Sequence, residues 1–292
     1  MTENVRVTRE GATTTITLAR PEKRNALSAA MMTDVTAALA AAGASDTLAV
    51  VIAADGPVFS AGHNFGDLAG ADLRAARDLF LLCTRMMETV QGIPQPVIAK
   101  VHALATAAGC QLVASCDLAI AADTAGFALP GGKGGLFCHT PLVPVARSVG
   151  RKRALELALT GDVIDAATAA DWGLINRAVP ADELDAAVAD LVARVTRGSA
   201  MGRSIGKRTF YAQVGLDQRQ AYDVAVEVMA AAALTDDAQE GIAAFLAKRP
   251  ATFTSLPVQP QVGVDLEAVV SAVRSGRDRP SPGQVDSDDA QL

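Results

Sequence analysis

The sequence predicts an α/β fold followed by a helical C-terminal region, and two patterns indicate this arrangement. Short apolar segments alternate three times with helical patterns before residue 125, which is typical of buried, parallel-type strands connected by helices. After Gly150 helical spacing dominates. We therefore expect a core over residues 1–198, a helical region over 199–253 and a tail, loose in part, over 254–292.

Local sequence signals place the strands and helices of the expected core. Polar and β-branched residues alternate over 5–8 and 13–18, on either side of a glycine, and this pattern predicts a β-hairpin. Ser28 is a typical N-cap for a helix that ends at Gly43. Further strands are expected over 48–53, 97–103 and 118–121, and further helices over 73–90 and 107–116.

The second half of the chain is expected to be mostly helical. Helical spacing occurs over residues 151–159, 166–172, 182–197, 199–210 and 218–246. Beyond Phe253, Pro, Gly, Ser and Asp become frequent, which is typical of a segment without a packed core. Within that tail we expect one short helix over residues 265–273.

Composition and charge argue against several classes of partner. The formal net charge is -6 at pH 7, which disfavours nucleic acid and anionic membranes, although it allows a small basic pocket for a phosphorylated ligand. No run of about 18 apolar residues predicts a membrane-spanning helix. The four cysteines include no C-x-x-C pair, so no metal site is expected. The first residues lack the pattern of a secretory signal, and we expect a cytoplasmic protein with reduced thiols.

Two segments rich in small residues are the candidate functional motifs. Residues 59–68 follow a buried strand, and residues 100–112 span the point where a strand meets a helix. The first turn of a helix has unpaired N–H groups and a partial positive charge, and small side chains at 107–109 would let a ligand oxygen approach them. Two such N–H groups aimed at one carbonyl oxygen would form an oxyanion hole. Close packing alone would also account for the small residues.

Six segments follow one another in an order that is typical of a known family. They are residues 20–27, 59–68, 107–110, 154–161, 170–179 and 240–249. In these segments the chain resembles the crotonase (enoyl-CoA hydratase/isomerase) family, over residues 5–253. The resemblance implies a spiral of ββα units with a C-terminal helical trimerisation region. It also implies an acyl-CoA or enoyl-CoA substrate, a role in fatty acid metabolism, and a homotrimer or dimer of trimers.

The resemblance further implies roles for particular residues. The backbone N–H groups of His63 and Ala108 would form the oxyanion hole for the thioester. Coenzyme A would be part of the substrate, so no separate cofactor is expected. Lys23 or Arg24 would contact its phosphates, Ala61 would meet the adenine, and Ala26 would also bind coenzyme A. Phe245 and Lys248 would complete the pocket in the same or a neighbouring subunit. For the three cations, ordinary solvated charge is the alternative.

The sequence departs from the family where a typical hydratase has two glutamates. One of these positions is Gln111, and the other, after Pro130, is Gly131. Adding water across a conjugated double bond needs a base for the water and an acid for the α-carbon. Gln111 can hold a water molecule but cannot take its proton, and Gly131 has no side chain. A carboxylate-dependent hydratase or isomerase mechanism is therefore not expected.

The glycine-rich segment 131–141 holds the remaining candidates for acid–base or nucleophilic chemistry. It is not a phosphate-binding P-loop, because Gly134 stands where Ser or Thr is required. It resembles the enoyl-CoA hydratase domain-containing protein 3 subgroup of the family, which also lacks the usual glutamates. His139 falls where the dienoyl-CoA isomerase branch has an aspartate, and a neutral imidazole could act as a base. Cys138 could be a nucleophile if its pKa were lowered. The alternatives are a structural histidine, as we interpret His102, and a buried apolar cysteine.

Two functions of different classes remain open. The first is an enzyme that acts on an acyl- or enoyl-CoA thioester, by hydration, isomerisation or hydrolysis, and His139 favours it. The second is a non-catalytic acyl-CoA-binding protein, which Gln111 and Gly131 favour. RNA binding on the same fold is disfavoured by the acidic charge.

Overall fold

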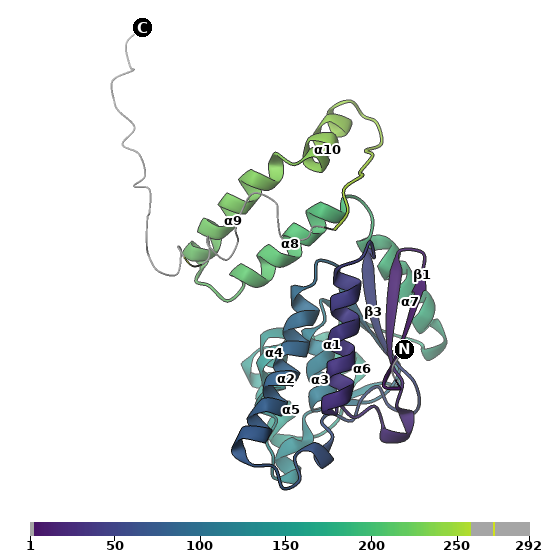
Figure 1. Ribbon diagram of the computed structural model, residues 1–292, viewed down its shortest axis with the longest axis vertical. Helices are drawn as coiled ribbons and strands as arrows, with labels where there is room; N and C mark the ends of the chain where they lie inside the picture. Colours follow the sequence, from purple (N-terminus) through teal and green to yellow (C-terminus); the bar gives the residue numbers. More distant parts are fainter. Residues whose placement is uncertain (1–2, 258–270, 272–292) are drawn as a thin grey trace, which may run out of the picture.

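A six-stranded sheet forms the centre of the computed structural model, which describes residues 3–257 and residue 271 (Figure 1). In spatial order its strands are β1 (Val5–Glu10), β2 (Thr13–Leu18), β3 (Ala49–Ala54), β4 (Val97–Val101), β6 (Leu118–Ala122) and β9 (Arg177–Val179). Only the β1–β2 hairpin is antiparallel, and each later pair in this sheet is parallel. The predicted α/β fold is confirmed.

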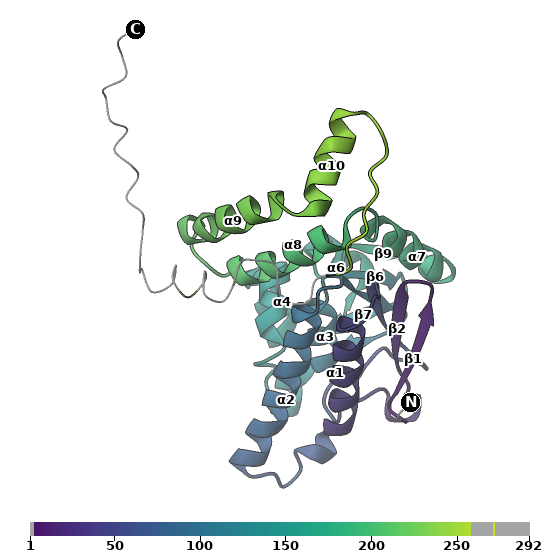
Figure 2. The same ribbon diagram turned by 45° about the horizontal axis from the view of Figure 1, so that its top comes forward.

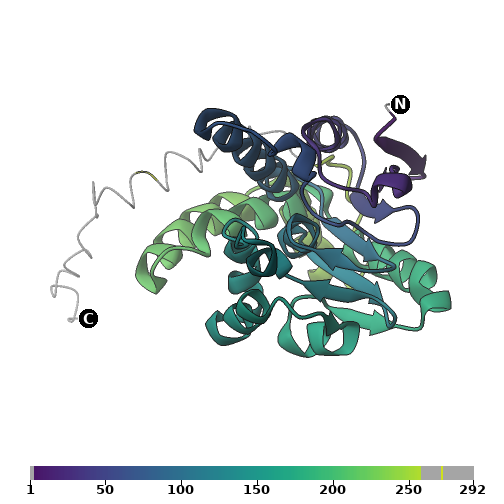
Figure 3. The same ribbon diagram turned by 90° about the horizontal axis from the view of Figure 1, so that it is seen from below.

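The apolar strands are explained by burial on both faces of this sheet. Val50 and Ile52 of β3 point to the large core under α1 (Ala29–Gly43), α2 (Leu73–Gly92) and α3 (Ala108–Ser115), whereas Val51 packs against α7 (Leu184–Val195) on the other face. Successive strand residues point to opposite faces, so helices on both sides require continuous apolar runs. Figure 3 shows these helices on either side of the strands.

A second, smaller sheet lies near the ends of the central strands. It contains β5 (Ala105–Thr106), β7 (Gly126–Ala128) and β8 (Ile164–Asp165). Single β-bridges between Ser60 and Ala105 and between Leu27 and His63 extend this pairing into the loops. Strands of two or three residues are too short to give a sequence pattern, and none of the three was predicted.

The helices that follow the sheet include one that the sequence did not indicate. α5 (Arg151–Thr160) and α6 (Ala166–Trp172) lie where helical spacing placed them. α4 (Leu142–Val149) was not among the predicted helices. In the structure Pro141 is the N-cap and Pro144 lies in the first turn, where a missing N–H breaks no helical hydrogen bond.

The C-terminal helices α8 (Ala200–Gln213), α9 (Gln218–Ala233) and α10 (Asp236–Leu246) project from the core (Figures 1 and 2). The prediction of a single helix over 218–246 is wrong, because one helix ends at Ala233 and the next begins at Asp236. The Thr235 side chain caps α10 by accepting a hydrogen bond from the backbone N–H of Ala238 at 3.3 Å. Apart from residue 271, the helix expected over 265–273 lies outside the described residues.

A buried ion pair attaches α8 to the core. The Lys207 ammonium lies 2.7 Å from the Asp117 carboxylate and donates to the backbone carbonyls of Val90 and Gln95 at 2.8 Å each. The Tyr211 hydroxyl donates to the other carboxylate oxygen of Asp117 at 2.8 Å. These contacts bring α8 against the end of α2 and the start of β4.

Candidate functional site

Three loops run side by side at the carboxyl ends of β2, β3 and β4. The Ala61 N–H donates to the Arg24 carbonyl at 3.0 Å, and the Leu27 N–H donates to the Gly62 carbonyl at 2.7 Å. The Thr106 N–H donates to the Ser60 carbonyl at 2.9 Å. In open α/β sheets, ligands bind outside the carboxyl ends of the strands. The structure therefore brings both predicted motifs to the edge where a ligand site is expected.

Gly62 brings the His63 segment against the first turn of α3. Its φ is +86°, and a Cβ there would lie 2.8 Å from the Ala107 Cβ and 3.1 Å from the Ala108 nitrogen. Ala107 itself has φ 49° and ψ -118°, an uncommon conformation for a residue with a side chain. Close packing thus requires the glycine, and that same packing places the His63 and Ala108 backbones next to each other.

The backbone N–H groups of His63 and Ala108 are candidate donors. Neither has a hydrogen-bond acceptor in the part of the chain that the structure describes. The Ala108 donor lies in the first turn of α3, where the N–H groups lack helical partners. Ala108 is completely buried, so its N–H is shielded from water.

Both ring nitrogens of the half-buried His63 side chain are shielded from water. Neither forms a hydrogen bond of ordinary geometry among residues 3–257, although the Leu27 backbone and the Asp67 carboxylate lie near enough to raise the pKa of the ring against the effect of burial. The ring meets the edge of Phe80 on α2, with 5.4 Å between the ring centroids. Burial lowers the pKa of the His63 side chain, so the neutral form is favoured at physiological pH.

Gln111 lies one turn after Ala108 on α3 and is buried. The Cys83 thiol of α2 lies 3.9 Å from its Oε1 atom, at a distance suited to a weak S–H donor. Phe80 and Cys83 are three residues apart and therefore share one face of α2. The His63 ring and the Gln111 amide thus lie against the same stripe of α2.

The space that a side chain at Gly131 would need is already filled by other residues of the same loop. A Cβ at Gly131 would collide with the Leu136 carbonyl oxygen and would lie 2.7 Å from the Cys138 sulfur. The Leu136 N–H also donates to the Gly131 carbonyl at 3.0 Å, which holds this turn together. No side chain can be added at residue 131 unless the loop moves.

Cys138 and His139 differ in their surroundings. Cys138 is buried, and this burial raises the pKa of its thiol, which opposes a nucleophilic role. His139 is exposed, and its ring meets the edge of Phe137 with 5.2 Å between centroids. Within the described residues the His139 imidazole forms no hydrogen bond, so the structure does not bond it to Gln111 or to His63.

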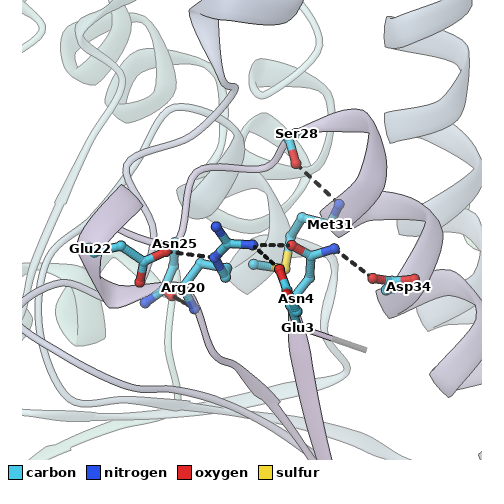
Figure 4. Close-up of polar contacts among 8 residues, drawn as sticks. All are labelled: Glu3, Asn4, Arg20, Glu22, Asn25, Ser28, Met31 and Asp34. Atoms are coloured by element: carbon cyan, nitrogen blue, oxygen red, sulfur yellow. Dashed lines mark hydrogen bonds and ion pairs between the residues drawn. The ribbon is translucent and has the colours of Figure 1, made fainter. Parts of the chain in front are cut away.

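The loop that carries Lys23, Arg24 and Ala26 is fixed by a residue that the sequence did not single out. The buried Asn25 amide donates to the carbonyls of Asp55 and Val58, at 2.7 and 3.1 Å. Its Oδ1 accepts from the Arg20 N–H at 2.9 Å, and Figure 4 shows Arg20 with its other partners beside it. Asn25 has φ 48°, and asparagine tolerates this left-handed conformation better than most residues.

Around this anchor, the predicted coenzyme A residues on the loops face outward. Lys23, Arg24 and Ala61 are exposed, and Ala26 is half-buried. Over the described ranges, Lys23 and Arg24 take part in no ion pair. Two free cations on a fixed loop are available for a ligand.

Phe245 and Lys248 lie elsewhere in the single chain. Phe245 is 82% exposed on α10, and Lys248 follows that helix with φ 52°. Figure 1 shows α10 at the end of the molecule opposite to the loops at the start of α1. Within one subunit, the structure does not bring these two residues to the predicted site.

The described part of the chain has neither a metal-binding cluster nor a membrane-spanning helix. Among residues 3–257, no cluster of three or more His, Cys, Asp or Glu side chains could bind a metal ion. None of the described helices has the length and apolar character needed to cross a membrane.

Comparison with known proteins identifies the family. Residues 8–256 match the enoyl-CoA hydratase/isomerase family. The chain belongs to this family. The mitochondrial enoyl-CoA hydratase domain-containing protein 3 of Mus musculus is 43% identical over 236 residues, covering 80% of this chain and 79% of that protein. The Homo sapiens protein of the same name is 43% identical over 247 residues, covering 83% and 81% of the two chains.

Solved structures agree with this assignment and confirm the resemblance found in the sequence. A Mycobacterium smegmatis enoyl-CoA hydratase superposes with a TM-score of 0.83 and 40% identity, covering 85% of this chain and 98% of that one. Human enoyl-coenzyme A hydratase domain-containing protein 3 gives a TM-score of 0.80 and 40% identity, covering 85% and 99%.

The predicted cytoplasmic location is wrong on this comparison. The relatives from mouse, rat and human are named as mitochondrial proteins, which points to the mitochondrion instead. The prediction depended on reduced thiols and on the lack of a secretory pattern. Those features do not distinguish the cytoplasm from the mitochondrial interior.

Proposed function

We propose that this protein binds an acyl- or enoyl-CoA thioester and polarises its carbonyl with the backbone N–H groups of His63 and Ala108. The observation that carries the proposal is the contact of Gly62 with the first turn of α3, where a Cβ would lie 3.1 Å from the Ala108 nitrogen. Fixed donors in a buried site stabilise developing negative charge without reorganisation, and one such donor contributes about 3 kcal/mol in known enzymes.

The free cations of the 20–28 loop support a role in coenzyme A binding. Lys23 and Arg24 would contact the phosphates, and Ala26 and Ala61 would lie along the nucleotide. Such a thioester ligand is consistent with a role in fatty acid metabolism, and the names of the relatives support a mitochondrial setting.

A homotrimer, or a dimer of trimers, would complete the pocket. Met229 is 74% exposed, Leu234 79% and Phe245 82%, and apolar surface of this kind marks protein interfaces. In such an assembly Phe245 and Lys248 of one subunit would reach the site of its neighbour. Light scattering tests the oligomer, and a stable monomer at micromolar concentration would contradict it.

Binding of thioesters is tested by calorimetry with a panel of acyl-CoAs. We expect saturable binding, weakened about tenfold or more by combined Lys23→Ala and Arg24→Ala substitutions, because each removes a charged hydrogen-bond donor. Lys152→Ala, at an exposed lysine of α5, is the matched control and should bind as the unaltered chain does. No saturable binding of any thioester at millimolar concentration would refute the proposal.

A non-catalytic acyl-CoA-binding protein is the second candidate. The closed position at Gly131 favours it, because that place has no room for an acid–base side chain. The enzyme hypothesis relies on His139 as the remaining base. His139→Ala separates the two: loss of turnover on the best substrate with retained binding supports the enzyme, whereas full turnover excludes His139 as its base.

A further inference from the structure

The turn that carries the two free cations has an uncommon backbone conformation. Arg24 and Asn25 follow each other with φ angles of 52° and 48°, so both are left-handed. This conformation is unfavourable for residues with a side chain, and arginine tolerates it less well than asparagine. Such a turn persists only where the residues around it hold it in place. The contacts that hold it therefore decide where Lys23 and Arg24 stand.

The backbone of Arg20 closes this turn. Its carbonyl accepts hydrogen bonds from the N–H groups of Lys23 and Asn25, at 3.0 and 2.9 Å, and its own N–H donates to the Asn25 Oδ1 at 2.9 Å. These three bonds lie within residues 20–25, so they shape the turn without attaching it to the rest of the molecule. The Asn25 amide attaches one side of the turn to the carbonyls of Asp55 and Val58.

The Arg20 guanidinium attaches the other side of the turn (Figure 4). Its Nε donates to the Glu22 carboxylate at 2.6 Å, inside the turn, and its Nη1 donates to the Asn4 Oδ1 at 3.3 Å. The Glu3 carboxylate lies 3.5 Å from the same Nη1. Asn4 in turn donates to the Asp34 carboxylate of α1 at 2.7 Å. One side chain thus connects the turn to the N-terminal segment and, through Asn4, to α1.

The chemistry of arginine suits this role. A guanidinium is a rigid fork with five N–H donors, so it can bond Glu22 and Asn4 at once, whereas a lysine ammonium is a single point charge. The Arg20 side chain is 29% exposed and already engaged by these partners. Lys23 and Arg24 are exposed and, over the described ranges, form no ion pair. Arg20 is therefore placed to act through these two cations and not on a ligand directly.

We propose that Arg20 is a positioning residue for the coenzyme A end of the site, which holds the turn so that Lys23 and Arg24 meet the ligand phosphates together. This rests on the proposed function, in which these two cations contact the phosphates. A ligand that binds a turn already held in place loses less conformational entropy than one that must order it. Loss of the Arg20 side chain therefore weakens binding only while there are cations to position.

A double-mutant cycle tests this dependence, with the affinity for butyryl-CoA measured by calorimetry on the full chain. Arg20→Ala should weaken binding about fivefold, as expected when side chains must be ordered on binding. In a chain that also carries Lys23→Ala and Arg24→Ala, the same substitution should change the affinity by less than about twofold. Arg20→Lys keeps the charge without the fork and should retain only part of the affinity. A general loss of structure would instead weaken binding in both backgrounds.

Hydrogen exchange in the ligand-free protein gives a second measurement. The N–H groups of Arg24 and Asn25, which bond the carbonyls of Pro21 and Arg20, should exchange faster in Arg20→Ala, whereas the Met32 N–H of α1 should keep its rate. Arg9→Ala is the matched control. Arg9 pairs with Asp46 at 2.7 Å near the turn between β1 and β2, away from the 20–28 loop, so its loss should change neither the affinity nor these exchange rates.

The outcomes separate the positioning role from the proposed function. Equal weakening by Arg20→Ala in both backgrounds, no weakening in the unaltered background, or unchanged exchange at Arg24 and Asn25 would overturn the positioning role and leave thioester binding standing. Unchanged affinity after Lys23→Ala with Arg24→Ala would remove the two cations from the site, and the role of Arg20 with them. No saturable binding of butyryl-CoA to the unaltered chain would overturn both proposals.

Discussion

The two halves of the candidate site differ in how the chain has built them. Around His63 and Ala108, loops from three strands are locked together by hydrogen bonds, and Gly62 sits where a larger residue would collide with the first turn of α3. Around Gly131, the chain folds back on itself and excludes a side chain, and Gln111 on α3 offers an amide and no carboxylate. We therefore expect the site to hold a carbonyl oxygen and to lack the two carboxylates that hydration of a double bond would use.

The largest expected effect concerns hydration. A general acid or base typically contributes about 10²- to 10⁴-fold in rate, so the loss of two should make hydration of a trans-2-enoyl-CoA at least about 10⁴-fold slower than in a family member with both carboxylates. Direct hydration assays on both proteins, side by side, measure this difference. A rate normal for the family would remove the contrast between the two halves of the site.

Introducing a carboxylate at residue 111 should increase the rate of hydration. Gln111→Glu is nearly isosteric and keeps its place beside Cys83, so we expect hydration to rise by about 10²-fold at most. The same assay checks it, with thioester affinity measured in parallel. Hydration that remains at the level of the unaltered chain would mean that the second missing group limits the reaction alone.

Because the space beside Gly131 is filled, alanine substitutions at Gly131 and at Gly134 of the same loop should lower the free energy of unfolding by different amounts. Gly131→Ala should lower the free energy of unfolding by about 1–3 kcal/mol, because its Cβ meets the Leu136 carbonyl and the Cys138 sulfur. Gly134→Ala is the control, since a Cβ there has nothing within 4 Å and should change stability by less than about 0.5 kcal/mol. Chemical denaturation measures both, and equal values would show that the loop is not closed.

The smallest effect is a pH dependence that belongs to His63. Burial holds its folded-state pKa below the unfolded value of about 6.5, so the unfolded chain binds the proton first as the pH falls. The free energy of unfolding should therefore decrease as the pH falls from about 6.5 through the folded-state pKa, and His63 should have no influence above that range. Denaturation of the unaltered chain and of His63→Leu on both sides of this pH isolates the component, and parallel curves would contradict it.

Much of the fold follows from periodicity, whereas parts of the site depend on contacts between distant residues. The Ser28 cap, the helix up to Gly43 and the buried strand over Ala49–Ala54 are visible in the sequence because each repeats a local pattern. The fold-back at Gly131, the outward position of His139 and the anchoring by Asn25 are not, since they arise where separate loops meet. Thr235 followed by two acidic residues was a readable cap signal, and it marks the break between α9 and α10.

The carbonyl stretching frequency of a bound thioester tests the account most directly. Butyryl-CoA labelled with ¹³C at the thioester carbonyl can be followed by difference infrared spectroscopy, free and in complex with the full chain. Two N–H donors aimed at one oxygen should lengthen the C=O bond, so we predict a shift to lower frequency on binding. A bound ligand whose carbonyl frequency stays at its value in water, or rises, would contradict the assignment of His63 and Ala108 as the polarising donors.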